Sequence, residues 1–536
     1  MSSVGYWFIG LALAYTLFLI FMGQFAKKRA ADGNGFFVGG RSFGTLFVTV
    51  CITGLFSGSS YIAIIELSYL TGISAVWYGI AETVQILIIA LILIGPFRKK
   101  ALVTISGLIG DHYGNKVRAL AGAITAFTFP MWSVATALAF ASAMTVFTGI
   151  SMVGSVAITA VLLLIYLQFG GMWSIGFTQL SNVIVFFIML IVGAIAFFIN
   201  PGIDGIRALF AEQPQMASWT GVGIQTIVAW FGTFLLNVVL AQAAFQMALS
   251  CKTEKEGQRG LLYAAILGIP LIIGAIVFGL AAAAVFPDEG LGLVAVPLYL
   301  MDTLPAPLVG LFFLGFWAAA LSWGAPCQFS GATSLGRDVG SAINPKATDQ
   351  QLVTYTKWSL VLLTVLMIGF ALLRSEQSAW WNVLAWVTRN SATFAPVVAA
   401  LFWPIVTKRA ALFSLFTGSF AGLLWYHLGA WHVSEFYLNT HPVWAGMIVN
   451  ITTISLVTLL DCAGQIEYRG VEKKPALYSL LTAAVLSIYM VFSFDLLYRT
   501  GLLGMVLFFI VSLIFIHLIS AVQRKQVNQN RLKKVL

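Results

Sequence analysis

The sequence predicts an all-α membrane protein with about 15 transmembrane helices. Of its 536 residues, 60% are hydrophobic and only 9% are charged, and the mean hydropathy is +0.94. A soluble domain of this length would need more charged residues to cover its surface, whereas lipid covers a membrane protein. The apolar residues also gather in segments of the length, about 20 residues, that a helix needs to cross a bilayer.

The apolar segments follow one another along the whole chain. The first covers 5–26, and we interpret it as a retained span because it is too long for a signal-peptide core and precedes Lys27 and Lys28. The next ten cover residues 43–70, 74–97, 118–148, 151–169, 173–200, 222–250, 260–286, 304–336, 353–373 and 380–406. The last four cover residues 410–430, 442–460, 477–497 and 501–521.

No loop between these segments is long enough for a second folded domain, so we expect one transmembrane domain over residues 1–536. Within it, 5–26 is a peripheral span, 43–406 is a ten-helix core, and 410–521 holds four peripheral spans. The remaining residues, 522–536, form a basic tail.

The distribution of basic residues predicts the orientation of these spans. Loops that follow odd-numbered spans, together with the tail, contain 25 of the 29 lysines and arginines, whereas the opposite side has only Arg207, Arg374 and Arg499. This asymmetry places the N-terminus outside and the C-terminus in the cytoplasm of a bacterial inner membrane. It also explains the net charge of +10 without a nucleic-acid partner.

The second span contains a run of small residues, Ser57 to Ser60, near its centre. Glycine and serine weaken a helix and free backbone carbonyls at mid-membrane depth. Discontinuous helices of this kind bind ions and substrates in secondary transporters. The alternative is that the small residues only allow neighbouring helices to pack closely.

Several motifs, in order along residues 35–410, resemble those of the sodium:solute symporter family. The first is GFFVGGRSFG at 35–44, and the span after it resembles the first core helix of that family, with Ser57, Tyr69 and Gly72 in register. The others are VTISGLIGDHYG at 103–114, the double glycine at 170–174, the segment at 245–256, the serine-rich stretch from Ala318 to Asp338, and residues 395–411.

The resemblance implies a fold that the sequence itself does not display as an internal repeat. It implies ten core helices in two inverted repeats of five, at about 43–200 and 222–406, and a broken first core helix. It also implies a binding site at the membrane midplane, with alternating access around it.

The resemblance further implies a sodium site, and this chain departs from it. In that family sodium is held by carbonyls of the first core helix, by a Ser–Ser pair on the eighth, and often by an aspartate on the fifth. The pair aligns with Ala325 and Pro326, and the aspartate with Gln179. Because sodium prefers several hard oxygen ligands, this is a degenerate site. The remaining candidate ion-coupling positions are Gly54, Ser57, Gln179, Ser322 and Ser330, so sodium coupling stays open.

Two carboxylates inside predicted spans, Glu66 and Glu82, offer a different coupling ion. A carboxylate at membrane depth is costly, so it usually faces a cavity or a partner, and it can exchange a proton. We therefore hypothesise that Glu82, together with Glu66, couples transport to protons. The alternative is a structural pair with Arg389, which lies about 13 Å into its span and could instead bind an anionic group of a substrate.

Polar side chains on the spans around the midplane are candidates for substrate binding: Ser57, Ser60, Tyr61, Tyr78, Glu82, Asn237, Gln242 and Arg389. Where sugar-transporting relatives in that family place a glutamine and a glutamate, this chain has Ser60 and Gly79. A sugar is therefore disfavoured. We expect a small polar solute such as an organic acid or an amino acid.

Together these features predict a secondary active transporter that couples a small-molecule solute to a sodium or proton gradient. We expect no cofactor besides Na⁺ or H⁺, no ATP, because a nucleotide-binding loop is missing, and no enzymatic activity, because no nucleophile and base stand at a motif spacing. The expected partners are the solute and the lipid bilayer, and the sequence does not determine an oligomeric state. Two alternatives remain: a proton-coupled or uncoupled carrier that has lost the sodium site, and a non-transporting membrane sensor or interaction module.

Overall fold

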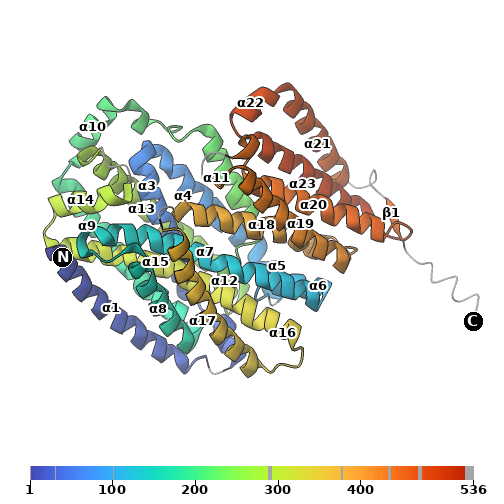
Figure 1. Ribbon diagram of the computed structural model, residues 1–536, viewed down its shortest axis with the longest axis horizontal. Helices are drawn as coiled ribbons and strands as arrows, with labels where there is room; N and C mark the ends of the chain where they lie inside the picture. The colour runs from blue at the N-terminus through green and yellow to red at the C-terminus, as the bar shows by residue number, and fades with distance from the viewer. Residues whose placement is uncertain are drawn as a thin grey trace, which may run out of the picture. The chain divides into compact units, whose positions relative to one another are not determined.

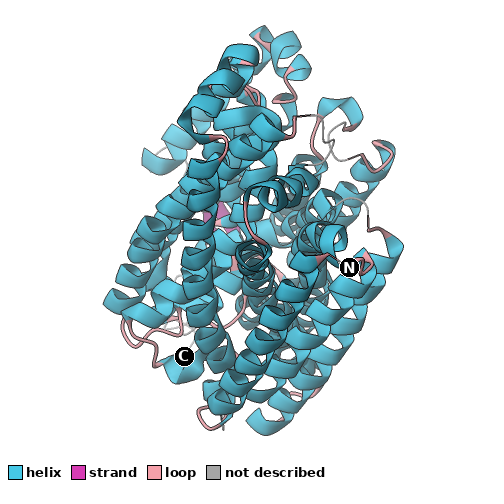
Figure 2. Cartoon of the chain, turned by 90° about the vertical axis from the view of Figure 1, so that its left-hand side faces the viewer, coloured by secondary structure: helices cyan, strands magenta, loops and turns pink. Residues whose placement is uncertain are grey.

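The computed structural model describes residues 2–30, 32–100, 102–287, 292–375, 378–432, 436–468 and 474–525. Figure 1 and Figure 2 show that this part of the chain is almost entirely helical. Its strands, β1 (Ile466–Tyr468) and β2 (Val522–Arg524), form one short antiparallel pair. The chain groups into two compact units, Met1–Gly107 with Gly122–Ala385, and Leu108–Ala121 with Trp386–Leu536.

The first unit contains most of the predicted core. Its helices before the midpoint of the chain are α1 (Ser3–Lys27), α2 (Gly33–Val38), η1 (Gly39–Arg41), α3 (Thr45–Thr71), η2 (Gly72–Ala75), α4 (Val76–Ile88), the π-helix η3 (Ile89–Leu93), α5 (Ile94–Lys99), α8 (Met152–Gly170), α9 (Met172–Ile199), α10 (Gly202–Glu212), η4 (Pro214–Ala217), α11 (Ile224–Asn237) and α12 (Gln242–Ala248). The later ones are α13 (Glu254–Val285), α14 (Gly292–Thr303), α15 (Ala306–Thr333), the π-helix η5 (Ser334–Val339), α16 (Gly340–Ile343) and α17 (Asp349–Leu373).

The second unit contains the C-terminal helices. These are α19 (Lys408–Leu428), η6 (Tyr437–Asn439), α20 (Pro442–Asp461), α21 (Lys474–Phe492), α22 (Phe494–Arg499) and α23 (Leu503–Ala521). Three further helices have residues in both units: α6 (Ile105–Tyr113), α7 (Asn115–Thr148) and α18 (Ser378–Phe402).

Local sequence explains where many of these helices begin and end. A serine or threonine hydroxyl accepts a hydrogen bond from a backbone N–H of the first turn, which satisfies one of the free donors at a helix start. Such caps are Ser2 of α1, Ser151 of α8, Thr253 of α13, Thr348 of α17 and Thr407 of α19. At the other end of α3, Gly72 has φ of +70°, and a Cβ there would lie 2.0 Å from the Met216 carbonyl oxygen. Only glycine fits that turn.

The core of the first unit lies around α3 and α15. α3 packs along α13 and also touches α9 and α15, and α15 in turn touches α1, α9 and α17. Nearly every side chain of α15 from Val309 to Thr333 is buried. A helix that is apolar and buried all round is typical of the centre of a helical membrane protein.

The predicted break in the first core helix is wrong, because α3 is one continuous α-helix from Thr45 to Thr71. Elsewhere in α3, the small residue Gly54 lets the Gln179 side chain approach the helix backbone closely. A break is found in the predicted span 222–250, where α11 and α12 meet at an angle of 52°.

The predicted number of spans is not confirmed. By length and hydropathy, 12 helices of the described residues can cross a membrane, or 13 when α11 and α12 count as one bent span. Two features account for the difference between 13 spans and the predicted 15. The run Thr45–Lys99 counts once although its 55 residues exceed one bilayer crossing, and α18 is not among the 12. The inverted repeat stays a prediction.

Candidate functional site

Glu82 of α4 lies in the core of the first unit and faces α3. Its Oε1 accepts a hydrogen bond from the Ser60 hydroxyl at 2.5 Å, and only 6% of its surface is exposed. The two residues line a cavity of about 10 Å³ between α3, α4 and α13, a volume that holds about one water molecule. The sequence proposed both residues, and the structure brings them together.

Three further hydroxyl groups line the same cavity, and that of Thr83 donates to a backbone carbonyl of its own helix. Thr53 and Tyr61 of α3 are buried, and their oxygens have no hydrogen-bond partner among the described residues. The opposite wall consists of apolar or small residues of α13, including Gly268 and Leu271. Buried polar groups are normally paired. The hydroxyls and the carboxyl of this cavity are therefore suited to hydrogen-bonding a water or a small polar ligand.

Gln179 of α9 forms a second buried polar contact, with α15, and packs against α3. Its Nε2 donates to the Ser322 carbonyl of α15 at 2.7 Å, and the side chain is 1% exposed. A Cβ added to Gly54 would lie 2.0 Å from Gln179 Oε1, so the amide packs directly on the backbone of α3. Three of the predicted ion-coupling residues thus meet at the junction of α3, α9 and α15.

The residues at this junction do not fit the sodium site that the resemblance implies. The Ser322 carbonyl already accepts a hydrogen bond from the side-chain N–H of Gln179. The hydrogen of that N–H group carries a partial positive charge, so it would repel a cation placed beside the carbonyl. Ala325 and Pro326 are buried in α15 and have no side-chain oxygen. The Ser322 hydroxyl has no partner among the described residues, but one hydroxyl does not make the oxygen-rich shell that a hard cation needs.

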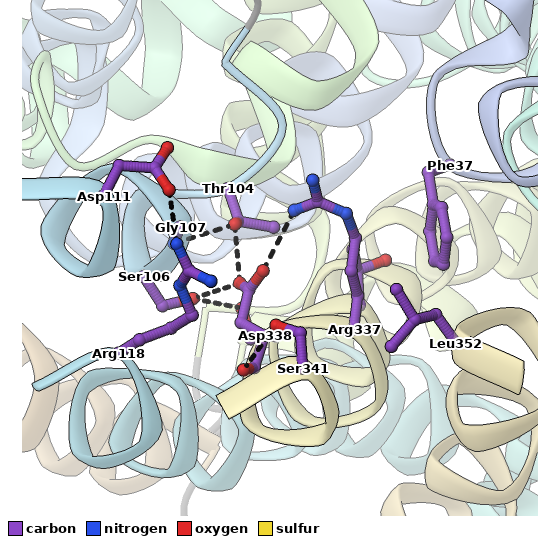
Figure 3. A network of polar contacts seen from close by, with 12 residues as sticks. Phe37, Thr104, Ser106, Gly107, Asp111, Arg118, Arg337, Asp338, Ser341 and Leu352 are labelled. Atoms are coloured by element: carbon purple, nitrogen blue, oxygen red, sulfur yellow. Dashed lines mark hydrogen bonds and ion pairs between the residues drawn. The ribbon is translucent and has the colours of Figure 1, made fainter. Parts of the chain in front are cut away.

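A third polar cluster surrounds Asp338 at the end of η5 (Figure 3). Its carboxylate accepts hydrogen bonds from the hydroxyls of Thr104 at 2.5 Å and Ser106 at 2.6 Å. It also forms an ion pair with Arg337 at 3.0 Å. Asp338 is 1% exposed. Because three donors from two distant parts of the chain meet it, this carboxylate fixes the segment 102–106 to η5.

Two glutamines of α12 extend the Asp338 cluster. Gln242 accepts from the Ile105 backbone N–H at 3.0 Å and donates to the Ser330 carbonyl at 3.0 Å and the Ser334 hydroxyl at 2.9 Å. Gln246 accepts from the Ser330 hydroxyl at 2.9 Å. Gln242 and Ser330 therefore belong to this network and are not among the residues that line the Glu82 cavity.

The remaining predicted residues lie elsewhere. Tyr78 packs edge-on against Trp230 and Phe234, Asn237 is the last residue of α11, and Glu66 is a half-buried residue of α3 outside the cavity lining. Arg389 belongs to the second unit, where it is buried and contacts the Asn390 side chain at 3.3 Å. Its predicted pairing with Glu82 or Glu66 stays a prediction. The side chain of Ser57 lies outside the described residues.

The sequence analysis did not propose Thr104, Ser106 and Asp338 as site residues. A signal was present, because Asp338 ends the serine-rich stretch and Thr104 and Ser106 lie in the motif at 103–114. Their proximity could not be read from the sequence, since about 230 residues separate the two motifs.

Comparison with known proteins gives consistent findings. The model of the sodium:solute symporter family matches residues 36–418. The high-affinity proline transporter PutP of Bacillus subtilis (strain 168) is 25% identical over 469 residues, which cover 82% of this chain and 96% of that protein. The high-affinity choline transporter 1 of Torpedo marmorata is 23% identical over 404 residues, which cover 70% of this chain and 68% of that protein.

A solved structure shares the fold. It is described as the substrate-bound outward-open state of a Na⁺-coupled sialic acid symporter that reveals a novel Na⁺ site. It aligns with a TM-score of 0.71 over 85% of this chain and 98% of its own. The sequences are 16% identical, so this likeness shows the fold alone.

Proposed function

This chain belongs to the sodium:solute symporter family, and on that premise we propose that it couples uptake of a small polar solute to the proton gradient through Glu82. Membership of the family confirms the predicted resemblance, and the relatives are transporters, not enzymes. A contrast between two sites supports a proton as the coupling ion. Glu82 lies in a cavity with hydroxyl groups that lack described partners. The junction at Gln179, in contrast, lacks the ligands for sodium.

The class of solute is part of the proposal. The relatives are named for proline and choline, which are small polar or charged molecules. Ser60, Thr53 and Tyr61 supply hydroxyls beside Glu82, and these groups suit such a solute. Because the cavity has room for about one water molecule, the solute must enter in a more open conformation.

The role of Glu82 follows from the cost of burying charge. An ionised carboxylate inside a membrane protein is costly when no cation lies beside it, and protonation removes the charge. The neutral acid can still hydrogen-bond the Ser60 hydroxyl, now as donor or acceptor. A protonated Glu82 therefore lets α3 and α4 close around the solute, and release of the proton on the other side accompanies release of the solute.

The Asp338 cluster supplies one of the contacts that must open during this cycle. It fixes the segment 102–106 to η5, in a part of the chain that the distribution of basic residues assigns to the cytoplasmic side. We propose that the protein is a multi-pass inner-membrane transporter with its N-terminus outside. In that orientation, separation of Thr104 and Ser106 from Asp338 opens the path to the cytoplasm.

The experiment that tests this proposal begins with identification of the solute. A metabolite library is screened for an increase in melting temperature of the purified protein, because a ligand that binds the folded state stabilises it. Uptake of the hit into proteoliposomes is then measured between pH 5.5 and 8 for the wild type, Glu82→Gln and Glu66→Gln.

We expect uptake by the wild type to depend on pH and to follow an imposed proton gradient, and we expect Glu82→Gln to lose both dependences. Glu66→Gln tests the other carboxylate of this region, and its uptake should keep the wild-type dependence on pH. If Glu82→Gln leaves both the rate and the pH dependence of uptake unchanged, the proposed role of Glu82 is wrong.

A further inference from the structure

We infer that the side-chain amide of Gln179 takes the place of a structural cation at the junction of α3, α9 and α15. In this chain a neutral hydrogen bond joins α9 to α15, and the same amide packs against the backbone of α3, at a junction that the family resemblance would join through sodium. The inference concerns packing at this junction, so it does not depend on the proposed role of Glu82.

The partner of Gln179 determines which way its amide points. The Ser322 carbonyl oxygen can only accept a hydrogen bond, so the group that lies 2.7 Å from it must be the NH₂ of Gln179. This places the positive end of the amide dipole against α15. The amide therefore makes the interaction with the carbonyl that a bound cation would make.

The space at the junction is already filled. The other end of the amide, Oε1, lies so close to Gly54 that a Cβ there would be 2.0 Å away. Gly54 is itself buried in α3. The Gln179 side chain therefore occupies the space between the backbones of α3 and α15, where an ion with several ligands would have to sit.

The hydrogen bonds continue from Gln179 without a charged group. Asn182 Nδ2 lies 3.5 Å from Gln179 Oε1, and Asn182 Oδ1 accepts from the Tyr15 hydroxyl of α1 at 2.5 Å. All three side chains are buried. Both ends of the Gln179 amide thus have described partners, and α1, α9 and α15 are connected through neutral groups alone.

Two consequences follow for the whole protein. Formation of the α3–α9–α15 junction should need no sodium, and sodium should not stabilise the folded protein through this junction. A carboxylate at position 179 would reverse this, because it cannot donate to the Ser322 carbonyl and would need a cation between the two oxygens.

The test compares melting temperatures of the purified full-length protein in sodium chloride and in potassium chloride at equal ionic strength. We expect Gln179→Met, which removes the amide at similar volume, to melt a few degrees below the wild type by the same amount in both salts. We expect Gln179→Asp to melt well below the wild type in potassium and to recover part of the loss in sodium. The matched control is Gln328→Asp, which changes a buried glutamine of α15 whose Nε2 donates to the Met367 sulfur. This variant should melt at the same temperature in both salts.

Two results would overturn the inference. One is a sodium-specific stabilisation of the wild type that Gln179→Met abolishes, because Gln179 would then be a sodium ligand. The other is a folded Gln179→Asp protein that melts at the same temperature in both salts.

If Gln179→Asp does not fold, the comparison of wild type with Gln179→Met decides alone. Sodium stabilisation that survives in Gln179→Met places the ion elsewhere and supports the inference. Since no transport is measured, none of these results depends on whether Glu82 binds a proton.

Discussion

Glu82 and Asp338 are both buried carboxyl groups of the first unit, but their surroundings differ. Asp338 accepts from two hydroxyls and pairs with Arg337, whereas the one partner of Glu82 among the described residues is the Ser60 hydroxyl. A carboxylate with three donors has its negative charge compensated, and its protonation would weaken every contact. A carboxylate with one hydroxyl donor can gain or lose a proton without breaking a network. The difference marks Asp338 as a structural acid and supports the proposal that Glu82 exchanges a proton.

The largest expected effect on stability comes from Asp338→Ala. It leaves Thr104, Ser106 and Arg337 without their common acceptor, and breaking a buried charged network of this kind costs about 3–5 kcal/mol. The measurement is chemical or thermal unfolding in detergent. Ser341→Ala serves as the control, since that hydroxyl donates only to the Asp338 backbone carbonyl and should cost no more than about 1 kcal/mol. Equal losses in the two variants would show that the carboxylate is not the centre of this cluster.

The next effect concerns the close packing of Gln179 against Gly54. Gly54→Ala places a methyl group against Gln179 Oε1, and overpacking of this kind costs about 1–3 kcal/mol. In a Gln179→Ala background, Gly54→Ala should lower the free energy of unfolding much less, because the Gln179 amide that the new methyl group would meet has been removed. The measurement is a double-mutant cycle of unfolding free energies. Additive effects would contradict the close contact between the two residues.

A smaller effect is expected from Ser60→Ala. The variant removes the hydroxyl that donates to Glu82 and should lower the free energy of unfolding by about 1 kcal/mol. This loss should be smaller than that of Asp338→Ala, because Ser60→Ala removes one neutral donor from Glu82 whereas Asp338→Ala removes an acid from a charged network. Thr83→Val is a suitable control, since its hydroxyl bonds only to the Gly79 carbonyl of its own helix. A Ser60→Ala protein as unstable as Asp338→Ala would place Glu82 among the structural acids.

The smallest effect is a pH dependence of stability in the second unit that involves neither acid. Nδ1 of His441 accepts from the Val443 N–H and caps α20, and burial lowers the pKa of His441 from 6.5 to about 4. Since the pKa in the folded state lies below that in the unfolded state, the cap contributes its full stability above pH 6.5. It loses this stability as the pH falls toward 4. We expect a loss of about 1 kcal/mol in unfolding at pH 5 relative to pH 7, and His441→Asn, which can still cap the helix, should remove this difference. A pH dependence that persists in His441→Asn would assign it to another group.

Much of the fold could be predicted from the sequence, because hydropathy and charge determine where helices cross a membrane. The predicted segment 173–200 corresponds to α9 (Met172–Ile199), and 353–373 lies within α17 (Asp349–Leu373). The helix break could not be placed correctly. α3 stays helical through Ser57 to Ser60, whereas the bend after Asn237 falls in a stretch without glycine or proline.

The buried polar residues of the candidate site could be picked out from the sequence, but their arrangement could not. Intramembrane polar residues such as Glu82, Ser60 and Gln179 stand out in an apolar sequence, and all three lie at buried contacts. Their partners are set by tertiary packing. The family resemblance grouped Gln179 with Ser322, but the hydrogen bond between the Gln179 amide and the Ser322 carbonyl, and the place of Gln242 in the Asp338 cluster, could not be predicted.

The most direct test of the exchangeable role of Glu82 is solute-dependent proton movement into proteoliposomes in sodium-free buffer, followed with a pH-sensitive dye inside the vesicles. We expect the solute to acidify the lumen of wild-type vesicles. We expect Glu82→Gln still to exchange labelled for unlabelled solute but to give no more acidification than empty vesicles. Acidification by Glu82→Gln at the wild-type rate, or a wild type that moves solute only when sodium is added, would contradict the exchangeable role of Glu82.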